Sequence, residues 1–321
     1  MPESAVDLIH RDVLERFRRL LDKGRLAHAY LFSGPQGTGK FETACAVARL
    51  VNCPDKGGAD CDCASCRKMR GGHHPDLFIV EKLEDKSEIM IGQFCERANN
   101  PFTPVIPRLT LRPFEAVRKV CIIRDAHLMS AEAANAFLKT LEEPPEATVI
   151  ILTTAVPARL LKTIVSRCHE VRFFAWGEKA LASRLQNEYD VASLPAGIMA
   201  RFHQGAWGPA AAGRKDFFER KNAFIDQVLG GPMKDPPADK EEVRECCQVL
   251  FSLFRDVSLH HAGAAAEQFV HQDRIPLIQD LARRHGPQSV GMIIAQIARV
   301  REAVDQNFNV KIAFLVLKEM I

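Results

Sequence analysis

The sequence predicts an α/β domain with a parallel sheet, followed by a region made only of helices. Short apolar runs alternate with helical segments up to about residue 175, and a glycine-rich loop joins the first run to the next helix. Strands that alternate with helices are typical of a doubly wound parallel sheet covered on both faces. Strand patterns end near residue 176, so the remainder is expected to be helical.

Composition places the chain among ordinary globular proteins. Its 321 residues are 47% hydrophobic and 26% charged, and the net charge of +3 is too small to indicate nucleic-acid binding by itself. The first 30 residues carry scattered charges and lack the pattern of a signal peptide. No run approaches the roughly 18 uncharged apolar residues that a membrane span needs. We therefore expect a cytoplasmic protein without a membrane anchor, in which the cysteines are reduced unless they bind metal.

The elements of the α/β domain follow from apolar spacing and from turn residues. An amphipathic helix is expected over 7–23, and further helices over 40–51, 131–144 and 157–167. Buried strands are expected at 29–34, 76–81, 117–126, 148–155 and 169–174. The proline-rich segment 99–113 is expected to be mostly loop.

The second half divides at glycine and proline residues. Helical pieces are expected over 178–189 and 194–229, then a polar, proline-rich linker over 230–240, and helical periodicity throughout 241–321. We predict three domains: 1–174 with a cysteine-containing module at about 53–66, a small helical domain over 175–213, and a helical C-terminal domain over 214–321.

The loop "FSGPQGTGKFETA" has most of a phosphate-binding motif. Gly34, Gly37, Gly39 and Lys40 stand where backbone N–H groups and a lysine would hold phosphate oxygens. The next residue should carry a hydroxyl for Mg²⁺, but it is Phe41. A glycine-rich turn between a strand and a helix can also be purely structural, and that alternative stays open.

A second magnesium contact is also missing. In P-loop ATPases a later apolar strand ends in an aspartate that helps to hold the metal. Here the strand in "KVCIIRDAH" ends in Arg124 followed by Asp125. An arginine at this position would repel a divalent cation, so the two changes together argue against ATP hydrolysis. Asp125 is expected to serve as a strand-end or helix-cap residue.

Four cysteines lie close together in "NCPDKGGADCDCASCRKM". Cys53, Cys61, Cys63 and Cys66 give the spacing C-x₇-C-x-C-x₂-C. Thiolates favour Zn²⁺ in closed tetrahedral sites, so we predict a structural zinc ion. Reduced, unligated cysteines are the alternative, and a redox pair fits four clustered thiols less well.

Several of these motifs together resemble a known family. "HAYLFSGPQGTGK", the cysteine cluster, "HHPDLF", "LRPFEAVRKVCIIRDAHLMSAEAANAFLKTLEEPP" and "TIVSRC" are similar to the bacterial DNA polymerase III clamp-loader subunits of the AAA+ superfamily. The resemblance is dense over the first 175 residues and looser in "REAVDQNFNVKIAFLVLKEM". It implies an AAA+ P-loop domain, a helical lid domain and a helical collar-type oligomerisation domain. It also implies a hetero-oligomeric ring with other clamp-loader subunits, which brings the sliding clamp and primer-template DNA as partners through the complex.

Within that family the departures favour a non-hydrolysing stator over the ATP-hydrolysing subunit. Besides Phe41 and Arg124, "QGAWGPAAAG" lacks the sensor arginine that hydrolysing members carry near the positions of Trp207, Gly208 and Pro209. ATP binding by the degenerate loop is left in doubt. The cysteine pattern departs as well, because Asp60 stands where the family usually has a cysteine, which leaves the second zinc ligand uncertain.

Arg167 of "SRC" matches the residue that, in the family, reaches the ATP of a neighbouring subunit. The resemblance implies an arginine finger acting in trans, although without it a surface arginine after a helix would be the simpler interpretation. Two other functions are compatible with the sequence. One is an active AAA+ ATPase subunit with unusual metal ligation. The other is a zinc-containing nucleic-acid-binding protein acting alone, which would use basic residues such as Arg283, Arg284, Arg299 and Arg301.

Overall fold

A computed structural model describes residues 10–55, 61–83, 86–98, 100–206, 210, 215–229, 240–305, 312 and 315. These residues form two compact units. The first extends to Trp176, and the second takes most of the chain from Gly177 onward. The expected boundary between a lid and a C-terminal domain at 213 stays a prediction. The expectations for 207–209 and 230–239 lie outside the described residues.

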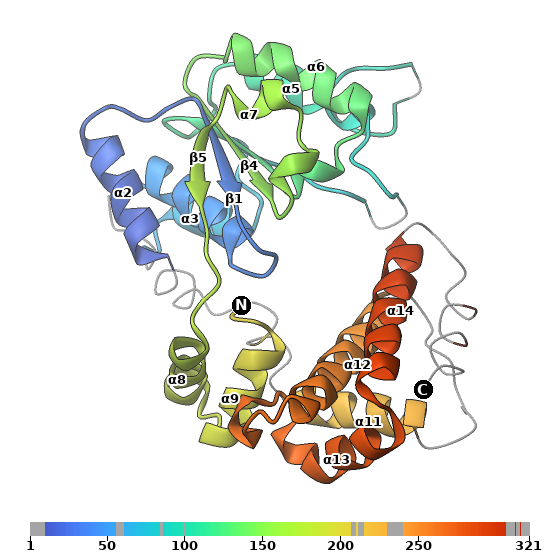
Figure 1. Ribbon diagram of the computed structural model, residues 1–321. Coiled ribbons are helices and arrows are strands. Elements are labelled where there is room, and N and C mark those ends of the chain that lie inside the picture. Colours follow the sequence, from blue (N-terminus) through green and yellow to red (C-terminus); the bar gives the residue numbers. More distant parts are fainter. Residues whose placement is uncertain are drawn as a thin grey trace. The chain divides into compact units, whose positions relative to one another are not determined.

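The first unit is built on five parallel strands in the order β2-β3-β4-β1-β5 (Figure 1). The strands are β1 (Ala29–Ser33), β2 (Leu77–Val80), β3 (Lys119–Ile123), β4 (Thr148–Thr154) and β5 (His169–Arg172). All five lie within the predicted segments. Every residue of β1, β3 and β4 is buried, which explains why these strands appear in the sequence as continuous apolar runs.

Two layers of helices cover the sheet (Figure 1). Alternate strand residues such as Tyr30, Val120 and Ile151 pack in one core with α2 (Arg11–Asp22), α3 (Lys40–Asn52) and α4 (Ala64–Arg70). The intervening residues, such as Leu31 and Cys121, form the opposite core with α5 (Val105–Thr110), α6 (Ala131–Glu142) and α7 (Lys162–Val165). The alternation follows the pleat, because successive strand side chains point to opposite faces.

Three sequence expectations for this unit need correction. The proline-rich segment 99–113 contains α5, with Pro104 as its N-cap and Pro107 in its first turn, where no backbone N–H is required. The helix expected over 157–167 is split into a 3₁₀ turn (η4, Pro157–Arg159) and α7. Helix α4, inside the cysteine module, was not predicted.

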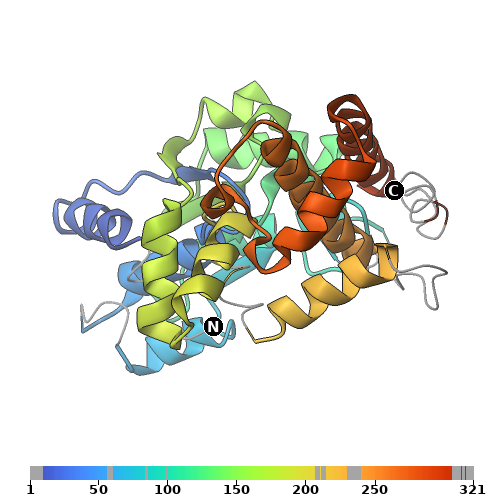
Figure 2. The same ribbon diagram turned by 60° about the horizontal axis from the view of Figure 1, so that its bottom comes forward.

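The second unit is helical in all its described secondary structure. It comprises α8 (Glu178–Tyr189), α9 (Ser193–Phe202), α11 (Phe217–Leu229), α12 (Lys240–His261), the 3₁₀ turns η5 (Ala266–Gln268) and η6 (Gln272–Arg274), α13 (Ile275–Arg284) and α14 (Pro287–Asp305). Helix α12 packs against α13 and α14, and α8 packs against α9 (Figures 1 and 2). The prediction of helix throughout 241–321 was therefore wrong between α12 and α13.

Buried polar contacts hold the segment between α12 and α13 in place. The Asp256 carboxylate accepts hydrogen bonds from the backbone N–H groups of Val270 and His271, at 3.0 and 2.7 Å. Lys221, which is almost fully buried, pairs with Asp273 at 2.7 Å. Such satisfied groups fix an irregular segment without a regular ladder. Among the described helices of the chain, none is long and apolar enough to cross a bilayer.

Candidate functional site

The glycine-rich loop lies at the carboxyl end of β1 and leads into α3. Strand β1 pairs with β4 on one side and with β5 on the other. Because the strands are parallel, their carboxyl ends meet at one edge of the sheet, where open α/β sheets bind ligands. The loop and the end of β3 with Arg124 therefore lie at the same edge of the sheet, as the sequence predicted, and the end of β4 lies between them.

The loop glycines are required by backbone geometry. Gly37 and Gly39 have φ angles of 74° and 79°, a region that favours glycine. Gly34 has a φ of 148° and is also needed for a second reason. A Cβ there would lie 2.2 Å from the carbonyl oxygen of Phe173, the residue that follows β5. A hydrogen bond of 2.7 Å from Phe173 N–H to the Ser33 carbonyl maintains this close approach.

Lys40 uses its ammonium group within the loop itself. The side chain is buried, and Nζ donates to the carbonyl oxygens of Gly34 and Pro35, at 2.8 and 2.6 Å. Burial lowers the pKa of Lys40, and the negative charges of Asp125 and Glu42 oppose that shift. The lysine is thus satisfied by the chain's own carbonyls.

The two residues at the expected metal-ligand positions contact each other. The Arg124 guanidinium lies over the Phe41 ring, 4.7 Å from its centroid, and pairs with Glu81 at 3.1 Å. Cation–π stacking of this kind is worth about 0.5–1 kcal/mol at an exposed site. Magnesium prefers oxygen ligands, but this pair offers a ring and a fixed cation. The residues present therefore do not fit a P-loop magnesium ion.

The polar groups beside the loop were not found from the sequence. Thr153 and Thr154, at the end of β4, are both buried. The Thr153 hydroxyl accepts from Asp125 N–H at 3.1 Å, and Thr154 Oγ1 lies 3.1 Å from His127 Nδ1. Two polar residues ending an apolar strand were the available signal. Asp125 is indeed a strand-end residue and the N-cap of a 3₁₀ turn (η3, Ala126–Leu128), with a φ of 50° and no side-chain cap bond.

His10 contributes to the loop from the start of α2. Its Nε2 donates to the Thr38 carbonyl at 2.5 Å, and its ring meets the Phe173 ring edge-on at 4.5 Å between centroids. A Cβ on Gly39 would come within 3.1 Å of the same Nε2. His10 therefore fixes the shape of the loop from outside, and nothing in its sequence neighbourhood indicated this role.

Arg167 lies just after α7, on a corner formed with the end of α6. Its guanidinium donates to the Thr163 carbonyl at 2.9 Å and pairs with Glu142 at 2.7 Å. The Arg167 side chain is 34% exposed and that of Glu142 is 48% exposed. A pair this accessible is worth less than about 1 kcal/mol and can be exchanged for a stronger anion. The guanidinium is thus oriented but remains available to solvent.

The four clustered cysteines converge as the spacing predicted. The sulfur atoms of Cys53, Cys61, Cys63 and Cys66 all lie within 4.8 Å of one another. Cys63 is the N-cap of α4, and its Sγ accepts from Cys66 N–H at 3.4 Å. Burial raises the pKa of Cys66. A metal ion would supply the positive charge that such a thiol needs to ionise. Donor type and convergence fit a metal ion held by four sulfurs.

Comparison with known proteins defines the class of this chain. Its fold matches a DNA polymerase III gamma subunit-related protein from Thermotoga maritima with a TM-score of 0.50, at 16% identity, over 96% of this chain and 97% of that one. The strand order, the loop and this match confirm the predicted AAA+ clamp-loader-like fold. Residues 9–176 match the family model of the DNA polymerase III delta subunit, and 237–320 match its C-terminal model. The chain belongs to the DNA polymerase III delta-subunit family.

Relatives within the family distinguish two kinds of subunit. The DNA polymerase III subunit delta' of Bacillus subtilis is 30% identical over 93% of this chain and 92% of its own length. The subunit tau of the same organism is 31% identical, but over only 60% of this chain and 33% of its own length. The delta' likeness thus extends over nearly all of both chains, and the tau likeness is partial.

Proposed function

We propose that this chain is a non-hydrolysing, delta-prime-type stator of the clamp loader, which presents Arg167 to ATP bound by a neighbouring subunit. One contrast carries the proposal. The two positions beside its own glycine loop where metal ligands are expected hold Phe41 and Arg124, which stack on each other. Arg167, in contrast, is an oriented and accessible cation. A chain that cannot hold the metal can still supply transition-state charge elsewhere, as an arginine finger does.

The partners follow from this role. The chain would assemble with other clamp-loader subunits in a hetero-oligomeric ring through its helical C-terminal region, 214–321, and would act in the cytoplasm. The sliding clamp and primer-template DNA would be reached through that complex during DNA replication. The full-length likeness to delta' subunits supports this assignment.

The proposal is tested in a reconstituted clamp loader. Arg167→Ala should reduce turnover at the neighbouring site by about 10³-fold, because an arginine finger contributes at least that much. Lys40→Ala should leave complex turnover nearly unchanged. Arg159→Ala, at an exposed arginine in η4, is the matched control for loss of a surface cation. Normal turnover with Arg167→Ala would refute the stator role.

An active ATPase subunit of the gamma/tau type is the second candidate. It is favoured by the intact glycines and by Lys40 in a strand–loop–helix context. It predicts the opposite pattern, in which Lys40→Ala greatly reduces turnover by the complex and Arg167→Ala has the smaller effect. Mg²⁺-dependent ATP turnover by the purified chain alone would establish it and overturn the stator proposal.

We propose that the cysteine module holds one structural zinc ion through Cys53, Cys61, Cys63 and Cys66. The support is the convergence of four sulfurs, the donor set of closed structural zinc sites. Elemental analysis should find one zinc per chain, which is lost on Cys63→Ser together with Cys66→Ser. Cys95→Ser, outside the cluster, should retain it. A metal-free wild-type chain with unchanged thermal stability would exclude a structural zinc.

A further inference from the structure

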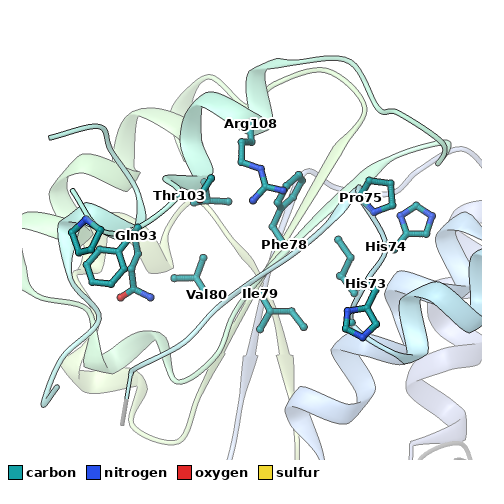
Figure 3. Close-up of a pocket in the computed structure, with 14 residues that line it drawn as sticks. His73, His74, Pro75, Phe78, Ile79, Val80, Gln93, Thr103 and Arg108 are labelled. Carbon is teal, nitrogen blue, oxygen red and sulfur yellow. The ribbon is translucent and has the colours of Figure 1, made fainter. Parts of the chain in front are cut away.

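A groove of about 640 Å³ follows strand β2, well away from the glycine loop in the strand order. Its walls come from 72–75, from β2 and from the segment that contains Gln93, Pro101, Phe102, Thr103 and α5. In Figure 3 the β2 residues Phe78, Ile79 and Val80 run through the middle of the groove. Arg108 and Thr103 lie along one side of them, and the turn with His73, His74 and Pro75 lies at one end. The volume is within the range of pockets that bind small ligands or short peptide segments.

The groove lies along the free edge of the sheet. Within the described part of the chain, β2 is the outermost strand of the sheet, and β3 is the strand with which it pairs. All four of its residues, Leu77 to Val80, line the groove. Because consecutive strand residues point to opposite faces, a cavity that touches all four must run along the strand's edge.

The hydrogen bonds with β3 identify which backbone groups face that edge. Val120 N–H donates to the Asp76 carbonyl at 2.9 Å, and Arg124 N–H donates to the Val80 carbonyl at 2.8 Å. In a parallel pair, alternate residues of one strand bond to the same neighbour. Residues 76, 78 and 80 therefore face β3, so the N–H and C=O of Ile79 face the groove.

The charge of the groove is one-sided. Arg108 places its guanidinium over the Phe78 ring, 4.5 Å from the centroid (Figure 3). Among the described residues no carboxylate pairs with this guanidinium, and the residues that line the groove include no aspartate or glutamate. Phe78, Val80 and Val105 supply an apolar wall beneath it. The groove thus combines a strand edge, an apolar wall and an unneutralised cation.

We propose that this groove binds an extended acidic peptide segment of a partner protein, which adds a strand beside β2. Strand addition supplies main-chain hydrogen bonds to Ile79, and alternate side chains of the peptide occupy the apolar wall. An acidic side chain of the peptide pairs with Arg108. The inference does not depend on the stator role, because it uses neither the glycine loop nor Arg167.

The test uses the full chain and a fluorescent eight-residue peptide of alternating valine and glutamate. Ile79→Pro removes only the N–H that faces the groove, so the ladder with β3 is kept, and proline is tolerated at such edge positions. Ile79→Pro should weaken peptide binding at least about tenfold, because the hydrogen bond from residue 79 is lost and the proline ring occupies the path of the peptide. Ile79→Val keeps the N–H and should stay within about twofold of the wild type.

A second variant keeps the test valid if Ile79→Pro does not fold. Arg108 is exposed, so Arg108→Glu should not affect folding. It should weaken the glutamate peptide about fivefold and strengthen a matched valine–lysine peptide. The proposal is overturned if the wild type does not bind the glutamate peptide at millimolar concentration, or if Ile79→Pro and Ile79→Val bind it equally. Displacement of the peptide by a single-stranded oligonucleotide would point to a nucleic-acid surface and would also overturn it.

Discussion

Two sites of the first unit use their cations in opposite ways. One is the glycine loop with Lys40 and Arg124, here called the loop corner, and the other is the segment after α7 with Arg167, the Arg167 corner. At the loop, Lys40 is buried against carbonyl oxygens and Arg124 is held by Glu81 and the Phe41 ring. At the other corner Arg167 keeps about a third of its side chain exposed and has one weak, exchangeable ion pair. The cations at the loop are satisfied within the chain, and the Arg167 guanidinium stays partly exposed to solvent.

Under the proposed function, this difference would let the unit serve ATP hydrolysis at a neighbouring subunit without performing it. A closed loop gives the sheet a fixed edge without nucleotide or metal. An exposed guanidinium costs little to redirect, because a partly solvated ion pair is worth less than about 1 kcal/mol.

Restoring both metal ligands should allow the glycine loop to bind a nucleotide together with Mg²⁺. Phe41→Ser with Arg124→Asp replaces the stacked pair by a hydroxyl and a carboxylate, the oxygen ligands that Mg²⁺ uses in P-loop proteins. We expect ADP affinity measured by calorimetry to become Mg²⁺-dependent and to rise at least about tenfold over the wild type. Tight, Mg²⁺-dependent binding by the wild type would show that the corner is not closed.

Lys40→Ala should lower stability because Lys40 is part of the fold. Its loss leaves the Gly34 carbonyl without its donor, whereas the Pro35 carbonyl keeps the Thr38 hydroxyl, and the expected cost is about 1–3 kcal/mol in the free energy of unfolding. Lys162→Ala, on the exposed face of α7, is the control and should change stability by less than about 0.5 kcal/mol. Urea denaturation measures both. Equal stability of the two variants would mean that Lys40 is free to serve a ligand.

Glu142→Gln removes the ion pair of Arg167 and tests whether that pair orients the guanidinium. Without the carboxylate, Arg167 keeps only the Thr163 carbonyl and is less well oriented. If Arg167 is a finger, turnover by the reconstituted complex should fall about threefold, with little change in KM. Glu143→Gln, at the adjacent exposed glutamate, should have no effect. A further loss when Glu142→Gln is added to Arg167→Ala would show that Glu142 does not act through Arg167.

Acid should weaken the loop corner through His127, which contacts Thr154. Burial lowers the pKa of His127, and Asp125 opposes the shift. The unfolded chain therefore takes up this proton at a higher pH than the folded chain does, so stability is lost as pH falls below about 6.5. In thermal unfolding at pH 7.5 and 5.5, His127→Gln should lose less stability than the wild type. An equal loss would assign the acid sensitivity to other groups.

The sequence predicted the elements better than it predicted their contacts. Strands β1 to β4 were found because they are apolar runs bounded by turn residues, and β5, in which only Val171 is buried, lies within the segment predicted at 169–174. Helix α5 was missed because Pro104 and Pro107 suggested a loop, although prolines at the N-cap and in the first turn leave no hydrogen bond unmade. Helix α4 was missed because its seven residues carry little apolar periodicity.

For the candidate site, local motifs were informative and long-range pairs were not. The spacing of Cys53, Cys61, Cys63 and Cys66 predicted a convergence that the structure confirms. The stacking of Phe41 on Arg124 joins a residue in the first turn of α3 to the residue that follows β3, and no local pattern specifies that contact. The same holds for Glu142 with Arg167, which meet only because α6 and α7 pack together.

Gly34 shows that a glycine of the phosphate-loop motif can be required by packing, independently of nucleotide binding. Its side chain is excluded by the Phe173 carbonyl, 2.2 Å from where a Cβ would stand, and that contact belongs to the packing of the sheet. Folding alone therefore requires this glycine, whether or not the loop binds a nucleotide. Glycine spacing in this loop reflects packing of the sheet, and the residues at positions 41 and 124 decide whether it can hold a metal ion.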